Sequence, residues 1–440
     1  MRRRLFIQCI VLAALHAQLA RAQAQAPAVR QLGAAEAESP LDVVASIASL
    51  RATKTGHVFI NDSRRRQIVV LDATLHLARV VTDVGGSPAH YGNGATGMFA
   101  YRGDSTLFLS GASLSIAVMD QDGNVGRAMA PPRPSDFGQL LGGSTGVPAL
   151  DAQQRLVYRA AGPSIQERVR LGKLGSSPIA DSAALVRFDF RTRSLDTVTY
   201  VRIYTPRIVP DEVQQGKMMM TRMSQILNPM PTVDDWAVLS DGTIVVARGL
   251  DYHVDLFDAN DHRASGPKVP FGWRRLSDDD KVALIDSSRA LAARLAASGA
   301  NVPNGVAVTP GAEVLGTGRS TVTTSAMSSP SKASNGSNDP PQRYVSAAEL
   351  PDYQPAFAVG SLRADQDARL WIRTIPPHPL SGGAIYDVLN ARGDLIDRVQ
   401  VPRGSAIAGF GPGGVVYLAE RDSTGLRLKR YQYTGTHPNR

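Results

Sequence analysis

The chain has 440 residues, of which 43% are hydrophobic and 20% are charged, and a formal net charge of +9. These values are typical of a folded soluble protein, and the length alone would allow about three domains. The basic residues form no stripe with interleaved aromatic residues, so we expect no nucleic-acid partner. The single cysteine, Cys9, lies in a segment that we expect to be removed, which excludes disulfides and thiolate chemistry from the mature protein.

Residues 1–22 have the three regions of a secretory signal peptide. Arginines at positions 2 to 4 precede an apolar run from Leu5 to Leu15, and small residues flank Arg21. The run is shorter than the roughly 20 residues that span a bilayer, so we expect cleavage and no membrane span. The mature chain would begin at Gln23, carry a net charge of +5 after the loss of four arginines from the +9 total, and reside in the periplasm or outside the cell.

The segment from Gly56 to Leu77 contains a unit of two short apolar runs joined by a polar turn. The run Val58 to Ile60 is β-branched or aromatic and too short for a helix, so it predicts a strand. Turn-forming residues follow at 61–63, a second run covers Gln67 to Leu71, and Leu75 to Val81 alternates like a half-buried outer strand. The unit therefore predicts an antiparallel meander.

The same unit recurs five more times along the chain. The later pairs of second and third strands are predicted at 107–109 and 115–119, 156–158 and 184–190, 244–246 and 253–257, 370–372 and 384–389, and 416–418 and 426–431. A further first strand precedes each pair. The short spacings of 46 and 49 residues match a propeller blade, which holds four strands in about 40 to 50 residues. The long spacings of 88 and 126 residues indicate insertions.

Three insertions are predicted, at 162–182, 205–234 and 270–352. The second contains the run KMMMTRM, which we expect to be flexible. The third contains a helix over Asp278 to Ala297, with Ser277 as its cap and Leu284, Leu291 and Leu295 on one stripe that rests on the ring as a lid. Residues 317–338 are rich in Ser, Thr and Gly without periodicity, which predicts disorder.

Three stretches carry a family resemblance: GHVFINDSRRRQIVVLD, SDGTIVVARGLDYHVDLFD and PGGVVYLAERDSTGLRLKRYQ. Their order of glycine turn, apolar strand, polar loop and apolar strand resembles the six-bladed β-propellers of secreted bacterial proteins, close to the NHL-repeat and TolB-like groups. The resemblance implies an all-β, six-bladed β-propeller over 23–440. It also implies a ring closed by an N-terminal strand, which we place at Ala28 to Leu32 joining the last unit, because an open ring leaves strand edges unpaired.

The sequence offers no catalytic constellation. The motif Gly92 to Gly97 matches a dinucleotide fingerprint and Gly142 to Gly146 matches a nucleophile elbow, but strands follow both where a helix is required. The histidines show no ligand pairing, so we predict no catalytic residue, no metal ligand and no cofactor. The turn DQDGN at Asp120 leaves calcium open, although such a turn is more often a hairpin.

The insertions point to one face of the ring. In a propeller, the link from second to third strand and the link between blades open on the same side, and all three insertions are links of these kinds. The second strands also end on this side, with Asp62, Arg159, Arg248, Arg373 and Glu420 near the rim as candidate ligand-binding residues. The arginines could hold an anionic group, but pairing among these residues as structural ion pairs is an equal alternative.

Two hypotheses about function follow. The first is a non-enzymatic, monomeric binding module that uses the capped face for a peptide, a glycan or a protein. The alternative is a hydrolase or lyase that resembles calcium-dependent lactonase propellers, which requires several carboxylate and amide ligands at the channel mouth. Since no such ligand set can be identified, the sequence favours the binding module.

Overall fold

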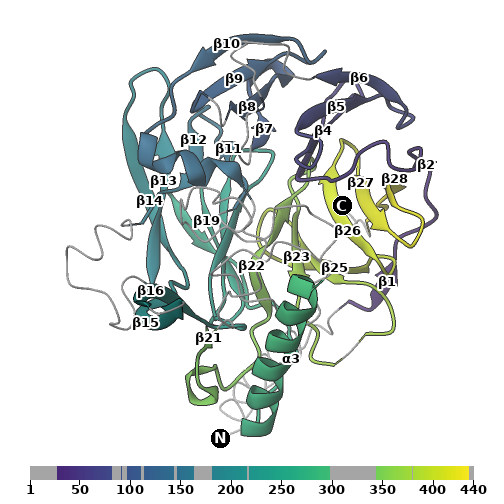
Figure 1. Ribbon diagram of the computed structural model, residues 1–440. Coiled ribbons are helices and arrows are strands. Elements are labelled where there is room, and N and C mark those ends of the chain that lie inside the picture. Colours follow the sequence, from purple (N-terminus) through teal and green to yellow (C-terminus); the bar gives the residue numbers. More distant parts are fainter. Residues whose placement is uncertain are drawn as a thin grey trace, which may run out of the picture.

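The computed structural model describes residues 27–81, 91, 97–110, 113–142, 146–162, 181–215, 218–297, 343–378 and 380–435. The predicted signal peptide, most of the insertion at 162–182 and the segment 317–338 lie outside these residues. The described chain is mostly β, built from small, largely antiparallel sheets (Figure 1). No helix in the described ranges has the length and apolar character needed to cross a membrane.

Six sheets follow one another along the chain, and we number them in that order. Sheet one holds β3 (Ser49–Ala52), β4 (Val58–Asp62), β5 (Gln67–Leu71) and β6 (Leu77–Val81). Sheet two holds β7 (Met98–Ala100), β8 (Thr106–Ser110), β9 (Ser115–Met119) and β10 (Val125–Met129). Sheet three holds β11 (Ala149–Leu150), β12 (Leu156–Arg159), β13 (Ser182–Phe188) and β14 (Leu195–Arg202).

The second half of the chain supplies the other three. Sheet four holds β17 (Asp235–Val238), β18 (Ile244–Arg248), β19 (His253–Phe257) and β20 (Arg263–Ser265). Sheet five holds β22 (Phe357–Ala364), β23 (Leu370–Thr374), β24 (Ile385–Leu389) and β25 (Leu395–Gln400), and sheet six holds β26 (Ser405–Phe410), β27 (Val415–Arg421) and β28 (Leu426–Gln432). Strands therefore occur at every predicted second and third strand position.

In the outer turns of the sheets, a carboxylate or amide oxygen repeatedly accepts hydrogen bonds from backbone N–H groups of the same turn. The Asp72 carboxylate accepts the backbone N–H groups of Thr74 at 2.9 Å and His76 at 3.0 Å. The Asp120 carboxylate of the DQDGN turn does the same with Asp122 and Asn124, at 2.9 and 2.8 Å. These short polar side chains stabilise tight turns by replacing missing backbone acceptors. In this structure the Asp120 carboxylate is thus a turn acceptor.

Hydrophobic clusters join each sheet to its neighbours. In β4, Val58 and Ile60 pack toward sheet six, whereas Phe59 packs toward sheet two. Alternate strand residues point to opposite faces, so the continuous apolar run reflects a strand buried on both sides. The remaining clusters join sheets two and three, three and four, four and five, and five and six. The sheets thereby close a ring, a β-propeller (Figure 1).

The innermost strands meet around the centre of this ring. Contacts join β26 to β3, β3 to β7, β7 to β11, β11 to β17, and β17 to β22. The segment that completes sheet six differs from the prediction. Strand β1 (Val29–Gln31), within the predicted 28–32 segment, pairs in parallel with β25 of sheet five. Instead, β2 (Ala37–Glu38) pairs with β28 and supplies the missing strand of sheet six.

A seventh sheet lies outside the ring and combines two distant segments. It holds β15 (Arg207–Gln215), β16 (Met218–Leu227) and β21 (Arg343–Tyr344), with β16 antiparallel to β15 and parallel to β21. The KMMMTRM run, predicted to be flexible, therefore lies largely within strand β16. The prediction was wrong because unbroken pairing from Arg207 with Ile226 to Gln215 with Met218 orders this run.

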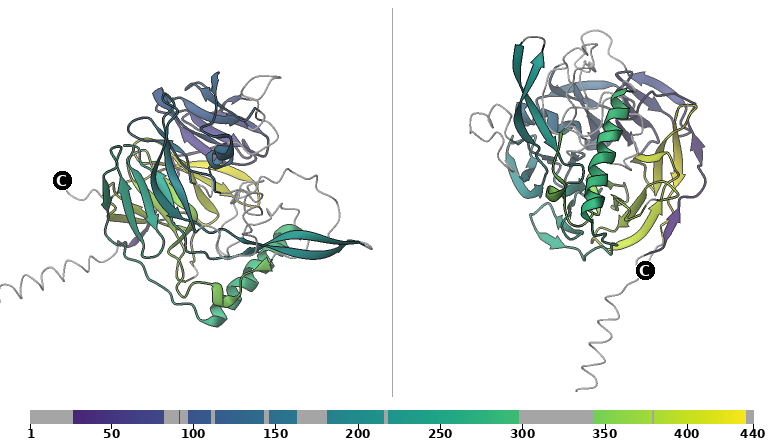
Figure 2. Two further views of the ribbon diagram at one scale, coloured as in Figure 1. Left: turned by 90° about the vertical axis from the view of Figure 1, so that its left-hand side faces the viewer. Right: turned by 60° about the horizontal axis from the view of Figure 1, so that its bottom comes forward.

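Helix α3 (Asp278–Ala297) has the predicted bounds and cap, with the Asp280 backbone N–H donating to Ser277 Oγ at 3.1 Å. Part of the packing of this helix can be followed in the described chain. Ile285 is buried against Val345 and Leu350, with Leu284 half-buried in the same cluster. Of the predicted stripe, Leu284 therefore packs with the chain around β21 and the 3-10 helix η4 (Ala347–Glu349). Figure 2 shows α3 and the β15–β16 hairpin on one side of the ring.

Two further 3-10 helices join strands of the ring. Helix η1 (Arg102–Asp104) links β7 to β8, and η2 (Pro134–Leu141) links β10 to β11. Proline at the start of η2 suits a helix N-terminus because its missing N–H would have no partner there. Leu140 of η2 is fully buried in the cluster between sheets two and three, which fixes the position of the neighbouring Gln139.

Candidate functional site

The five candidate residues lie on second strands of their sheets, in very different surroundings. Asp62 is fully buried at the end of β4. Its carboxylate accepts hydrogen bonds from the Ala45 backbone N–H at 2.8 Å, from Ser46 Oγ at 2.9 Å and from the Arg65 backbone N–H at 3.1 Å. These bonds tie the turn after β4 to the chain that enters β3. Within the described structure, Asp62 therefore organises the local backbone.

Arg248 and Glu420 are engaged in ion pairs. Arg248 donates to the carboxylates of Asp234 and Asp255, each at 2.8 Å. Burial opposes the charge of Arg248, but these two hydrogen bonds outweigh it and raise the pKa of the guanidinium. Glu420 lies 2.7 Å from Lys429 Nζ and accepts the Tyr431 hydroxyl at 2.7 Å. Both residues are thus engaged in ion pairs, but their partners lie outside the five candidates, so these are not the pairs among candidates that the sequence left open.

Arg373 and Arg159 complete the set. Arg373 lies on β23 opposite Tyr386, is half-buried and has an interaction partner of its own. Arg159, at the end of β12, is also half-buried, but its hydrogen bond to Gln139 Oε1 is long at 3.4 Å. No carboxylate of the described chain lies within ion-pair distance of Arg159. Burial lowers the pKa of the Arg159 guanidinium to about 10, and the attraction of Asp235 acts in the opposite direction.

Asp235 is a residue that sequence reasoning missed. It opens β17, is only 2% exposed, and accepts the backbone N–H groups of Trp236 and Leu362, each at 3.0 Å. The second of these bonds crosses from sheet four to sheet five. Burial raises the pKa of Asp235 to about 6, against the N–H groups of Leu362 and Trp236 and the charge of Arg363, which lower it.

Arg363, on β22 of sheet five, interacts electrostatically with Asp235. It is half-buried and donates to the carbonyl oxygens of Gly360 at 3.1 Å and Leu362 at 2.9 Å. Both Arg159 and Arg363 interact electrostatically with Asp235, so two cations from sheets three and five flank one buried carboxylate on sheet four. We call Arg159, Gln139, Asp235 and Arg363 the central cluster. The one sequence signal for it was the Asp234-Asp235 pair in front of an apolar strand.

The described residues contain no group of three or more His, Cys, Asp or Glu side chains that could hold a metal ion. Most of the Gly92 to Gly97 motif and the middle of the Gly142 to Gly146 motif lie outside the described residues. The first motif is followed by strands β7 and β8, as the sequence predicted. The chemistry visible in the central cluster is electrostatic: two guanidinium groups can bind an anion with charge-assisted hydrogen bonds.

No family model and no curated protein matches the chain. Among solved structures, it is similar to a DUF4221 family member from Bacteroides vulgatus, with 11% identity, a TM-score of 0.44, and coverage of 92% of this chain and 98% of that one. A streptogramin B lyase gives 10% identity, a TM-score of 0.37, and coverage of 90% and 86%. Virginiamycin B lyase from Staphylococcus aureus gives 9% identity, a TM-score of 0.35, and coverage of 89% and 82%. At these values the similarities carry no argument about activity.

Proposed function

We propose that the chain is an exported, six-bladed β-propeller that acts as a binding module, and that an anionic group of its partner binds at the central cluster. The six pairwise hydrophobic clusters between successive sheets support the blade count. The sheet shared by β15, β16 and β21 supports a cap assembled from two insertions on one face. The partner is a peptide, a glycan or a protein that carries a carboxylate or a phosphate.

The half-buried position of Arg159 without a carboxylate in ion-pair distance carries this proposal. A desolvated charge is costly unless it is paired. Arg248, at the same strand position in the next sheet, has two carboxylate partners, whereas Arg159 has a single long bond to an amide oxygen. An anion bound beside Arg159 would supply the acceptors that the protein does not, and Arg363, which also interacts with Asp235, would share the charge.

Binding of simple anions tests the proposal. We expect calorimetric titration with succinate or inorganic phosphate to give binding that Arg159→Gln weakens by about tenfold, the loss expected for one charge-assisted hydrogen bond. Arg64→Gln is the matched control, because Arg64 is exposed in the turn after β4 on the same side of the ring. Equal weakening by both variants, or no effect of Arg159→Gln, would overturn the assignment of the site.

Calcium titration of the same protein addresses the calcium-dependent lactonase or lyase that the sequence leaves open. Tight calcium binding would favour that hydrolase, since its mechanism requires the ion. Unchanged heats on calcium addition, together with anion binding that depends on Arg159, would favour the binding module.

Export is a separate part of the proposal and has its own test. N-terminal sequencing of the protein from the periplasm or the medium should begin within a few residues of Gln23, because the small-residue site ends at Ala22. A retained Met1 on the exported protein would contradict cleavage.

A further inference from the structure

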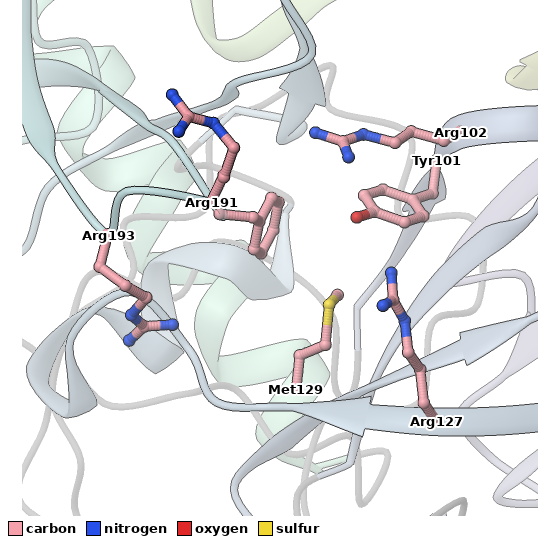
Figure 3. A pocket seen from close by; sticks show the side chains of 7 residues that line it. Tyr101, Arg102, Arg127, Met129, Arg191 and Arg193 are labelled. Atoms are coloured by element: carbon pink, nitrogen blue, oxygen red, sulfur yellow. The ribbon is translucent and has the colours of Figure 1, made fainter.

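A pocket of about 340 Å³ lies between sheets two and three. Its walls come from the turn after β7, from strand β10 and from the turn after β13. The lining residues are Tyr101, Arg102, Arg127, Met129, Phe190, Arg191 and Arg193. Figure 3 shows the four arginine side chains arranged around the pocket, with the Tyr101 ring and the Met129 side chain between them. We call this site the arginine pocket.

The arginine pocket shares no residue with the central cluster. In an antiparallel sheet of four strands, the first and third strands end on one side and the second and fourth end on the other. Arg102 follows the first strand of sheet two, and Arg191 and Arg193 follow the third strand of sheet three. Arg159 ends a second strand. The two sites are therefore separate, and this inference does not depend on the proposed function.

Local backbone geometry directs the charged side chains into the pocket. The pairing of β10 with β9 is irregular between Val125 and Ala128, and such a bulge re-aims the side chains beside it. Arg127 and Met129 are two residues apart and so share one face of the strand. In the turn after β13, the Asp189 carboxylate accepts the backbone N–H groups of Arg191 at 2.6 Å and Thr192 at 3.2 Å. This turn is therefore ordered before any ligand binds.

Aromatic rings form the apolar part of the arginine pocket. Tyr101 and Phe190 meet edge to face, with ring centroids 5.8 Å apart and an interplanar angle of 82°. Because Tyr101 belongs to sheet two and Phe190 to sheet three, this contact fixes the width of the site. Met129 adds a polarizable thioether, which packs well against rings. A planar ligand would thus find aromatic and sulfur surface between the arginines.

The residues that line the arginine pocket carry no negative charge. Its lining contains four arginines and no acidic residue. Arg102 donates to the Gln154 carbonyl at 3.3 Å and Arg193 to the Pro131 carbonyl at 3.0 Å, both neutral acceptors. Arg127 and Arg191 have no side-chain hydrogen bond or ion pair with any described residue. The neighbouring Asp189 carboxylate is used by the turn, where the N–H groups of Arg191 and Thr192 and then the charge of Arg191 lower its pKa.

We infer that the arginine pocket binds a small, ring-bearing compound with at least two negative charges, carried by carboxylate, sulfate or phosphate groups. Guanidinium groups bind such anions through paired, charge-assisted hydrogen bonds, and they also stack on aromatic rings. The volume is at the lower end of the 300 to 1,000 Å³ typical of ligand pockets, so one ring system with its anionic groups is the size that fits.

A naphthalene disulfonate is a suitable probe because it combines a planar ring with two charges. Titration of the full mature protein should give binding that Arg127→Gln and Arg191→Gln each weaken by about tenfold. Neither arginine has a hydrogen bond from its side chain to the described protein, so neither variant should lower the unfolding midpoint. Arg392→Gln is the control, since Arg392 lies in an exposed turn of sheet five with its side chain 85% accessible.

Three comparisons decide the outcome. Sulfate, which lacks the ring, and naphthalene, which lacks the charges, should each bind at least about tenfold more weakly than the disulfonate. Arg159→Gln should leave disulfonate binding unchanged, which keeps this test distinct from that of the central cluster. Binding that is the same in Arg127→Gln, Arg191→Gln and Arg392→Gln would overturn the inference, as would equal affinity for sulfate or the absence of binding.

Discussion

The arginines of the ring fall into two groups, represented by Arg187 and Arg127. Arg187, on β13, is 1% exposed, donates to the Asp261 carboxylate and the Asp258 carbonyl, and lies 3.3 Å from the Asp151 carboxylate. Arg127, on the neighbouring sheet, is exposed and has no acceptor in the described chain. Arg187, which links sheets three and four, therefore has carboxylate partners. Arg127, which lines the arginine pocket, has none in the described chain.

This difference separates scaffold from binding surface. A buried guanidinium without carboxylates would destabilise the fold by several kcal/mol, so the sequence must supply acidic partners wherever arginine is used between blades. An exposed guanidinium is hydrated and needs no partner for the chain to fold. Arginines without acidic partners can therefore be retained for a ligand, and Arg159 lies between the two groups because it is half-buried and still lacks a carboxylate.

The largest effect is expected for Arg187→Met. The variant leaves the Asp151 carboxylate in a buried site with Arg155 as its remaining ion-pair partner, at 2.7 Å. Breaking a buried ion pair from one side costs about 3 to 5 kcal/mol. Urea unfolding should show this loss for Arg187→Met and a change below about 0.5 kcal/mol for the control Arg127→Met. Equal stabilities of the two variants would remove the distinction between the groups.

A smaller effect is expected in the pH dependence of the paired group. Burial raises the pKa of Asp255, but hydrogen bonds from Ser265, Arg248 and Arg263 outweigh it and lower the pKa to about 2. The folded value is thus below the unfolded value of about 3.9, so the stabilisation is complete above about pH 4 and is lost as pH falls toward 2. The stability difference between wild type and Asp255→Asn should shrink over this range by on the order of 1 kcal/mol.

Asp235→Asn is the control with the opposite sign. Burial raises the folded pKa of Asp235 to about 6, above its unfolded value, so ionisation of this carboxylate costs stability. The stability of wild type relative to Asp235→Asn should therefore fall as pH rises from about 4 to 6. The stabilities of Asp255→Asn and Asp235→Asn relative to wild type should therefore change with pH in opposite directions. The same direction for both would contradict the difference between Asp255, which is paired with arginines, and Asp235, which is buried and bound by backbone N–H groups.

Much of the fold could be predicted from the sequence because its signals are local. The run Val58 to Ile60 is apolar on both strand faces, and it lies in a strand buried on both sides. The helix Asp278 to Ala297 was predicted with its observed bounds because Ser277 and three acidic residues mark its start. Pairing between distant segments was less predictable. Strand β2 at 37–38 has only two residues, too few for a pattern, and its place beside β28 is set by ring geometry.

The candidate sites show the same limit. The ends of the predicted second strands identified Asp62, Arg248 and Glu420 as candidates. The position of a residue along a strand does not predict which carboxylate forms an ion pair with which arginine. Asp255 meets Arg248 across a strand pair, and Asp235 meets Leu362 across two sheets. The arginine pocket is built from three segments between residues 101 and 193, and no segment alone has a binding motif. Its signal was the turn sequence Phe190 to Arg193, which reads as an ordinary polar hairpin.

The smallest expected effect concerns the repulsion among arginines without acidic partners. Arg102, Arg127, Arg191 and Arg193 surround one pocket without an acidic residue in its lining, so each charge is slightly unfavourable to the others. Like charges at a surface destabilise a protein by a few tenths of a kcal/mol, and salt screens them over a Debye length of about 10 Å at 0.1 M. Arg127→Gln should therefore stabilise the protein by roughly 0.3 kcal/mol at low ionic strength, with the gain disappearing at high salt. Thermal unfolding at two salt concentrations measures the difference, and Arg392→Gln, whose arginine lies 3.5 Å from the Asp394 carboxylate, should show no such gain. A stability loss in Arg127→Gln at low salt would mean that Arg127 has an acidic partner in solution, and Arg127 would then belong with the scaffold arginines.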